Sequence, residues 1–299
     1  MSSTEGILAG RHPSMPSRSG RLHGADFRWA IAFVLPYAAV FLLFVIYPVG
    51  SALLTAARPR LYAQLLSDPL YPTTVVNTAL FVGFGVNLTM FLALLLSGFF
   101  LRPRWWIKAL LGAFVLPWLV AAAQASVSFH WMLIGQQGLI DGLLGALFGI
   151  EGPVWFASRW LALGSDIAVY IWKWLPFWTV ILIAGRLTIP REIYDQAAVD
   201  GATGWRRFVH VTVPLLSNLY LLCALLFTLW SLGEFTIPYL VSNGAPGEST
   251  EVLATLGFHY AFDLSAPALG AATVMSALPL LIPVAILLMK RLRARQVQL

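Results

Sequence analysis

Seven charged residues stand close together in the last third of this 299-residue sequence, between Arg186 and Arg207, although the sequence on either side is strongly apolar. Acid–base catalysis near a membrane surface would need a cluster of carboxylates, His or Cys. The sequence contains no H-E-x-x-H metal pattern and no G-x-x-x-x-G-K-[ST] loop for nucleotide phosphates. Its single cysteine, Cys223, lies in an apolar run, where packing is the expected role. We therefore predict no catalytic and no metal-binding residues.

The charged segment has the pattern of a short helix. Pro190 suits a first helical turn, and Glu192 and Asp195 near that end favour the helix dipole. At about 100° per residue, one face carries mostly small side chains and the opposite face carries polar ones. The first face comprises Ile193, Tyr194, Ala197, Ala198, Gly201 and Ala202, and the second comprises Glu192, Asp195, Gln196 and Asp200. Small side chains allow another backbone to come close, so we expect this helix to fit a groove.

A second helix is predicted after a bend. Gly201 and Gly204 weaken helix continuity, and Thr203 could cap the second helix at its start. The spacing i, i+3, i+4, i+7 then recurs at Trp205, Phe208, Val209 and Thr212. Pro214 leads into the next apolar run. Periodicity alone favours an amphipathic pair of helices lying on a membrane surface.

The elements around this loop are predicted to cross a membrane. The chain is 59% hydrophobic and 11% charged, where a soluble protein carries about a quarter charged residues. Six stretches reach the roughly 20 apolar residues that cross a bilayer as a helix. They are 29–50, 75–101, about 109–134, about 163–187, about 215–241 and about 268–289. The predicted fold class is an all-α membrane protein with six transmembrane helices.

The distribution of Lys and Arg predicts the orientation. Fifteen of the 19 basic residues fall in the N-terminal tail, the second and fourth connections and the C-terminus, and Lys and Arg are most frequent on the cytoplasmic side. Both termini are therefore expected in the cytoplasm. We expect residues 1–28 to form a mobile cytoplasmic tail, 29–289 a six-span domain with a cytoplasmic loop at 188–214, and 290–299 a basic cytoplasmic tail. The same bias accounts for the net charge of +6, so no nucleic-acid partner is predicted.

The charged loop resembles the EAA loop of bacterial ABC importer permeases, in which E-A-A, three residues, Gly, nine residues and I-x-L-P follow one another. Asp195, Gln196 and Ala197 stand at the E-A-A positions, and Gly201 follows at the required spacing. V-T-V-P at 211–214 closes the motif. Asp for Glu keeps the carboxylate and Val keeps the apolar character, whereas Gln for Ala at the second position departs from the pattern.

The resemblance extends over nearly the whole chain after residue 29 and indicates the carbohydrate branch of the binding-protein-dependent permeases. D-G-A at 200–202 and IWKWLPFWTVILIAGRLTIPREIY at 171–194 are similar to the maltose and glycerol-3-phosphate permeases. NGAPGESTEVL at 243–253 resembles the G-G-P and S-T pattern of that branch, with Ala245 in place of the second Gly. The resemblance implies the type I ABC importer permease fold and the import of a sugar or polyol.

In that family the loop forms a coupling helix that docks in a cleft of a separate ATPase. The resemblance implies this role for Asp195, Gln196, Ala197, Ala198, Asp200, Gly201 and Ala202. It implies no cofactor in this chain, because two cytoplasmic ATPase subunits would bind ATP and Mg. A second six-span permease, expected to be a different chain, an extracytoplasmic solute-binding protein and membrane lipid complete the assembly implied for the bacterial inner membrane.

Charged and polar groups at membrane depth are costly and are therefore candidates for the solute pathway. Glu234 lies in the fifth predicted span, with Trp230 one turn earlier on the same face and Tyr239 further along. A carboxylate beside an aromatic surface suits a polyol or sugar, but Glu234 could equally hold a helix contact with the partner permease. Asn87 in the second span could line the path or join helices.

Two further ionisable groups in the fourth predicted span, Asp166 and Lys173, lie seven residues apart and could form a structural pair. His130 is expected to be a hydrogen-bonded interior residue rather than a ligand.

Three alternatives stay open at this point. A secondary transporter would need coupling-ion sites and commonly shows internal repeats, neither of which is evident. A polytopic membrane enzyme would need the catalytic cluster that the spacing of the acids does not provide. An ABC permease for a non-carbohydrate solute would share the loop motif but not the solute.

Overall fold

The computed structural model describes residues 25–135 and 138–296, and the regular elements in that part of the chain are helices. The chain divides into two compact units between Ser51 and Ala52. Residues 1–24 of the predicted N-terminal tail and 297–299 of the predicted C-terminal tail lie outside the described residues. The ends of both tails that adjoin the membrane domain are helical, because the first helix begins at Ala25 and the last one ends at Gln296.

The first unit is an apolar helix. It consists of α1 (Ala25–Phe41), a π-helical turn η1 (Leu42–Ile46) and the start of α2 (Tyr47–Ala56). The stretch Trp29–Ala56 is long and apolar enough to cross a membrane, and none of its most apolar window is buried. A helix that exposes apolar side chains all round satisfies its backbone internally and suits a lipid environment.

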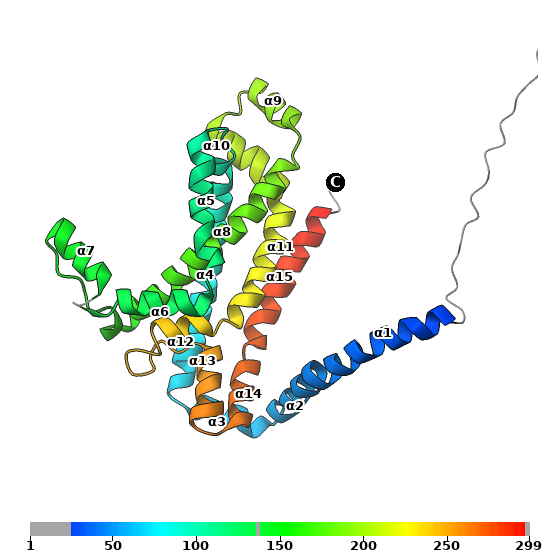
Figure 1. Ribbon diagram of the computed structural model, residues 1–299, viewed down its shortest axis with the longest axis vertical. Helices are drawn as coiled ribbons and strands as arrows, with labels where there is room; N and C mark the ends of the chain where they lie inside the picture. The colour runs from blue at the N-terminus through cyan, green and yellow to red at the C-terminus, as the bar shows by residue number, and fades with distance from the viewer. Residues whose placement is uncertain (1–24, 136–137, 297–299) are drawn as a thin grey trace, which may run out of the picture. The chain divides into compact units, whose positions relative to one another are not determined.

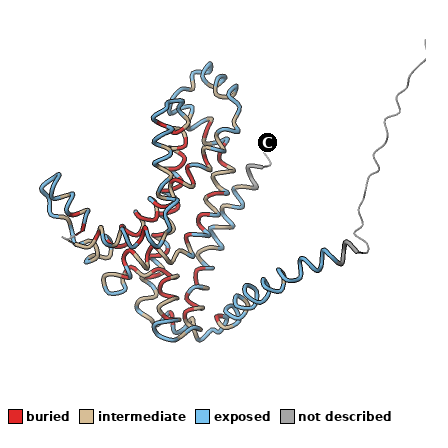
Figure 2. Tube along the Cα trace, in the orientation of Figure 1, coloured by how far each residue is buried: buried red, intermediate tan, exposed pale blue. Residues whose placement is uncertain are grey.

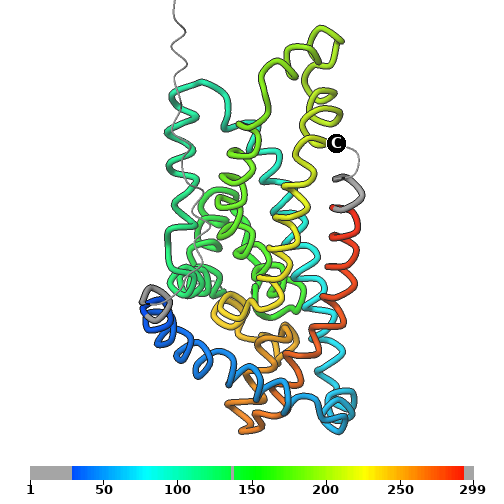
Figure 3. The backbone as a smooth tube through the Cα atoms, turned by 90° about the vertical axis from the view of Figure 1, so that its right-hand side faces the viewer, coloured from blue at the N-terminus to red at the C-terminus, as the bar shows by residue number. Residues whose placement is uncertain are grey.

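Two long helices, α4 (Leu70–Phe100) and α8 (Arg159–Leu187), form the centre of the second unit and lie side by side in Figures 1 and 3. They approach closely at Gly85, where a Cβ atom would lie 3.2 Å from a ring carbon of Tyr170. The buried residues concentrate along these inner faces (Figure 2). Large side chains such as Met90, Trp178 and Phe227 fill the space between α4, α8 and α11 (Val213–Leu232).

Some of the shorter helices of the second unit lie at its two ends. In Figure 1, α9 and α10 mark one end, and α3, α13 and α14 mark the opposite end. The remaining elements are α3 (Pro59–Ser67), α5 (Trp105–Leu119), α6 (Ala122–Met132), α7 (Leu139–Phe148), η3 (Trp155–Ala157), α9 (Arg191–Val199), α10 (Gly204–Arg207), η4 (Phe208–Thr212), α12 (Thr236–Val241), α13 (Leu253–Phe258), η5 (His259–Asp263), α14 (Pro267–Met275) and α15 (Leu278–Gln296).

Five stretches of the described chain could each cross a membrane as one helix, and a sixth is a bent pair. The five are Trp29–Ala56, Leu70–Phe100, Arg159–Leu187, Gly204–Leu232 and Pro267–Leu292. All six predicted spans are therefore found, with two corrections. The third is not one helix, because α5 and α6 meet at 95°. The fifth begins at Gly204 and ends at Leu232, since Gly233 is a helix C-cap.

The bend between α5 and α6 is held by Lys173 of α8. Its ammonium group donates hydrogen bonds to the carbonyl oxygens of Pro117 and Trp118, 3.0 Å each, and to that of Val120. These carbonyls lie at the end of α5, where backbone acceptors lack partners within the helix and the dipole favours a cation. A charge in the middle of a span is thus accounted for by the broken helix beside it.

The predicted pairing of Asp166 with Lys173 is wrong. Ser242 donates a hydrogen bond of 2.7 Å from its hydroxyl to Asp166 Oδ2, and Thr250 lies 3.1 Å from the same hydroxyl. Asp166 and Lys173 lie two helical turns apart on α8. Each of them forms its hydrogen bonds with residues of another element instead of with the other. His130 is a hydrogen-bonded interior residue as expected, with Nδ1 2.7 Å from the Val241 carbonyl oxygen.

We predict that Lys173→Met destabilises the protein by about 2–4 kcal/mol, because three backbone carbonyls of α5 and the bend lose their donor away from water. Thermal unfolding of the purified chain in detergent measures the loss. Lys108→Met is the matched control, since Lys108 is on α5 and exposed, and it should change stability by less than about 0.5 kcal/mol. Equal midpoints for the two variants would contradict the role of Lys173.

Candidate functional site

The first helix of the charged loop, α9, projects from one end of the second unit (Figure 1). The seven predicted coupling residues lie on α9 and in the bend that follows it, and five of them are exposed, namely Asp195, Gln196, Ala198, Asp200 and Gly201. Ala197 and Ala202 are half-buried, and Val199 is 89% exposed. The end of α9 thus presents an exposed apolar side chain, Val199, between Asp195 and Asp200 in the chain.

The backbone conformation of Gly201 ends α9. Its φ angle is +77°, a left-handed conformation that favours glycine. The Ala202 amide donates to the Ala197 carbonyl at 2.8 Å, and the Gly201 amide donates to the Ala198 carbonyl at 3.1 Å. This pair of hydrogen bonds is the Schellman arrangement, which satisfies the last carbonyls of a helix. The D-G-A segment therefore has a structural role as well as a position on the exposed tip.

The second helix of the loop is continuous with a span. After the bend, α10 and the π-helical turn η4 run into α11, so that Gly204–Leu232 forms one stretch of 29 residues. The predicted order of helix, bend and helix is confirmed, with two local differences. Pro190 is the N-cap of α9 rather than a residue of its first turn, and the N-cap Thr203 makes no side-chain capping hydrogen bond.

The four predicted solute-pathway residues occupy different surroundings. Glu234 follows the fifth span instead of lying in it, and Glu234 Oε1 accepts a hydrogen bond of 3.1 Å from the Ile237 amide, which caps α12. Trp230 is 49% exposed at the end of α11. Tyr239 stacks on Phe235, with ring centroids 4.6 Å apart. Asn87 is exposed on α4 and donates to the Gly83 carbonyl of its own helix at 2.7 Å.

Sequence reasoning missed the aromatic group around Trp230. The Trp230 ring centroid lies 5.7 Å from those of Trp174 and Trp178 and 5.9 Å from that of Phe177, all three on α8. The signal was available, because 174, 177 and 178 follow the i, i+3, i+4 spacing of one helical face. The exposed part of Trp230 is thus supported by a packed aromatic layer from the neighbouring span.

No family model matches the sequence. The chain is 31% identical over 242 residues to the sulfoquinovosyl glycerol transport system permease of Agrobacterium fabrum, covering 75% of this chain and 77% of that protein. It is 29% identical to the trehalose/maltose transport system permease of Thermococcus litoralis, covering 76% and 81%. The chain belongs to the ABC importer permeases. It is a multi-pass membrane protein and a translocation subunit.

The fold agrees with that family. A crystal structure of a bacterial ABC transporter that imports the polysaccharide alginate contains a chain that matches this permease with a TM-score of 0.75 at 17% identity, covering 90% of this chain and 96% of that one. A second structure, of the alginate transporter in complex with an alginate-bound periplasmic protein, matches with a TM-score of 0.76 at 18% identity, covering 88% and 93%. These likenesses concern the fold alone.

The permease also carries a rigid loop at the end opposite to α9. Asn77 of α4 donates to the carbonyl oxygens of Ser249 and Glu251, 2.8 Å each, and its own amide oxygen accepts from Arg159 at 2.7 Å. These bonds tie the segment resembling G-G-P to the ends of α4 and α8. Burial raises the pKa of the Glu251 carboxyl above its usual value, although a hydrogen bond from Thr255 opposes the shift.

We predict that Glu251→Gln stabilises the permease at pH 7.5 and that the gain disappears near pH 4. The folded state favours the protonated carboxyl, so the stability contributed by Glu251 is present below its unfolded pKa and is lost as pH rises through the folded value. Unfolding midpoints of both proteins between pH 4 and pH 8 measure the effect. His259, Glu248 and Asp263 also interact with or lie near this carboxyl. Glu248→Gln removes an exposed carboxylate and is the control, expected to give no comparable gain.

Proposed function

We propose that this permease imports a sugar or sugar-like polyol in an ATP-driven, binding-protein-dependent assembly of a bacterial inner membrane, with both termini in the cytoplasm. Two similar permeases, named for sulfoquinovosyl glycerol and for trehalose and maltose, support the solute class. The observation that carries the coupling role is the exposed tip of α9, joined through a four-residue bend to one helix of 29 residues.

The assembly would contain a second six-span permease of a different sequence, two cytoplasmic ATPase subunits and an extracytoplasmic solute-binding protein. ATP and Mg, bound by the ATPase subunits, supply the energy. Asp195, Gln196, Ala198, Asp200 and Gly201 form the docking surface for an ATPase subunit. A displacement of α9 then reaches the far side of the membrane through Gly204–Leu232, which at about 1.5 Å per residue is about 44 Å long.

The solute path is proposed at the far end of that helix. Trp230 offers half of an aromatic face, and such faces pack on the apolar C–H faces of a sugar ring. Glu234, beyond the end of the span, adds a carboxylate acceptor that the backbone amides of Ile237 and Thr236 hold at the start of α12. Asn87 and Tyr239 are further candidates for the path.

Ala198→Trp is predicted to abolish uptake and to release the ATPase from the solubilised complex, because an indole at this exposed position blocks docking. Gly201→Trp would confuse this block with backbone strain, since position 201 has φ +77°. The readouts are uptake in cells and mass spectrometry of the proteins that purify with the tagged permease. Lys108→Trp, at an exposed position of α5, is the control. This variant should retain uptake and should still purify with the ATPase. Normal uptake by Ala198→Trp would contradict the coupling role, and uptake without ATP by the reconstituted chain alone would favour a secondary transporter.

The solute-binding protein that purifies with the permease is predicted to be stabilised by a sugar or polyol and not by amino acids, measured as a thermal shift against a panel of both. With that solute, Trp230→Ala should raise the half-saturating concentration for uptake several-fold, because an aromatic contact contributes about 0.5–1.5 kcal/mol. Trp230→Phe keeps a ring and should recover most of the loss. Stabilisation by a non-carbohydrate solute would contradict the solute class and leave the ABC assembly intact.

A further inference from the structure

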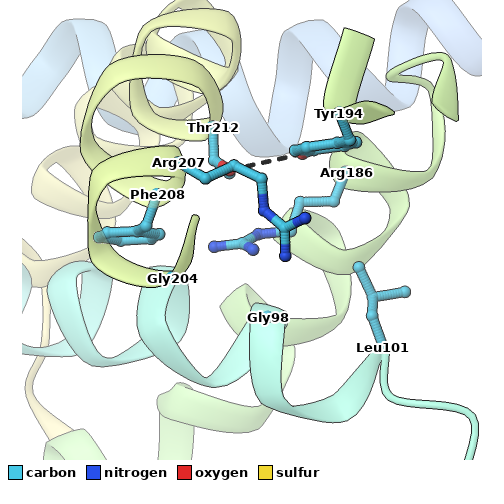
Figure 4. Close-up of a pocket in the computed structure, with 8 residues that line it drawn as sticks. All are labelled: Gly98, Leu101, Arg186, Tyr194, Gly204, Arg207, Phe208 and Thr212. Carbon is cyan, nitrogen blue, oxygen red and sulfur yellow. Dashed lines mark hydrogen bonds between the residues drawn. The ribbon is translucent and has the colours of Figure 1, made fainter. Parts of the chain in front are cut away.

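A cavity of about 340 Å³ lies beneath the charged loop, where α4 and α8 end and the second helix of the loop begins (Figure 4). Its wall comes from Gly98 and Leu101 at the end of α4, Arg186 of α8, Tyr194 of α9, and Gly204, Arg207, Phe208 and Thr212 of the second helix. Elements of the membrane core and of the coupling loop therefore share one pocket.

Two guanidinium groups point into this space (Figure 4). The Arg186 group lies over the Phe208 ring at 5.5 Å, and the Arg207 group lies over the Tyr194 ring at 5.7 Å. Arg186 Nη2 also donates to the Leu94 carbonyl at 2.8 Å. Within the described residues, neither arginine forms an ion pair with a carboxylate. Aromatic faces and a carbonyl hold both cations in place without neutralising them.

The Arg186 guanidinium keeps an N–H group without a partner in the described chain. This group, at Nε, is buried, which is costly for a charged side chain. Two like charges near the low-dielectric membrane also repel each other. The hydroxyl groups of Tyr194 and Thr212 form a hydrogen bond of 3.5 Å at the edge of the same space, which leaves one of the two hydroxyl protons for another acceptor.

Gly98 provides the room for the buried cation. A Cβ atom at position 98 would lie 2.6 Å from Arg186 Nη1, too close for the guanidinium to stay where it is. A larger residue would therefore displace Arg186 without changing the charge of the pocket.

The position of the pocket indicates the kind of anion. The candidate membrane spans Leu70–Phe100 and Arg159–Leu187 both end at the pocket, and the end of a span is expected to lie near the lipid headgroups. Trp105 and Trp106 follow the end of α4, and Trp205 follows the pocket residue Gly204. Their exposed fractions are 81%, 40% and 64%, as expected for interfacial tryptophans. Paired guanidinium groups match the geometry of a phosphate, and basic pockets between spans on the cytoplasmic side suit phosphate headgroups.

We propose that Arg186 and Arg207 form a phosphate site, occupied by the headgroup of an anionic phospholipid of the inner leaflet. The bound phosphate joins the coupling loop, through Arg207 and Tyr194, to the end of α8, through Arg186. The lipid thereby stabilises the orientation of α9. Lipid binding would be a property of the chain itself, so it can be measured without transport and without an ATPase.

The test places the purified permease in nanodiscs of phosphatidylcholine, alone or with increasing phosphatidylglycerol, and in a third arm adds inorganic phosphate to the phosphatidylcholine discs. The readouts are the unfolding midpoint and the lipids retained in native mass spectrometry. We expect phosphatidylglycerol to raise the midpoint and to be retained. For Arg207→Gln, the phosphatidylglycerol fraction that gives half of the effect should rise roughly tenfold, because charge-assisted hydrogen bonds to phosphate are lost.

Arg206→Gln is the matched control, since it removes the same charge from the adjacent exposed residue, which does not line the pocket. In Arg206→Gln, phosphatidylglycerol should raise the unfolding midpoint as it does in the unchanged protein. Gly98→Ala should lose the response with no change in charge. Equal losses in Arg206→Gln and Arg207→Gln, or no preference for phosphatidylglycerol in the unchanged protein, would overturn the site. A response to inorganic phosphate without one to phosphatidylglycerol would keep the phosphate site and overturn the lipid as its source.

Discussion

The contact of the Lys173 ammonium with the carbonyls of Pro117, Trp118 and Val120 is the constraint on which the arrangement of the second unit depends. It stabilises the end of α5 inside the membrane region and so permits the 95° bend to α6. Because of the bend, α6 packs on α12, and His130 of α6 reaches the Val241 carbonyl at the end of α12. At the other end of α12, Glu234 accepts a hydrogen bond from the Ile237 amide, whereas Ser242, the C-cap beside Val241, binds Asp166. Polar groups at membrane depth therefore support one another through helix ends.

The fifth span is one continuous helix that ends at this group of contacts. A continuous stretch from Gly204 to Leu232 joins the coupling loop to the capped break at Glu234, with Trp230 seated against α8 just before it. A helix transmits a displacement along its axis, and the four residues between α9 and Gly204 separate α9 from that axis. The bend after α9 and the aromatic face at Trp230 thus lie at the two ends of the continuous helix Gly204–Leu232.

Much of the fold could be predicted because hydrophobic length is a local property. Six apolar stretches and one charged loop can be read from composition, and the D-G-A segment predicts a helix end because glycine adopts the left-handed conformation that the Schellman arrangement of Gly201 requires. The partners of Asp166 and Lys173 could not be predicted in this way. Their seven-residue spacing satisfies a pairing rule, yet Ser242 and the end of α5 are distant in sequence and become neighbours only after the helices pack.

The sequence by itself determined the membrane spans, the exposed polar loop and the fold family, since each depends on residue type and spacing along the chain. Only the tertiary structure decided that the third span is broken, that Glu234 caps a short helix beyond the fifth span, and that Arg186 and Arg207 share one pocket. The physical reason is that a buried polar group selects its partner by distance in space. Helices that meet far apart in the sequence present carbonyls, carboxylates and cations that no periodicity can place together.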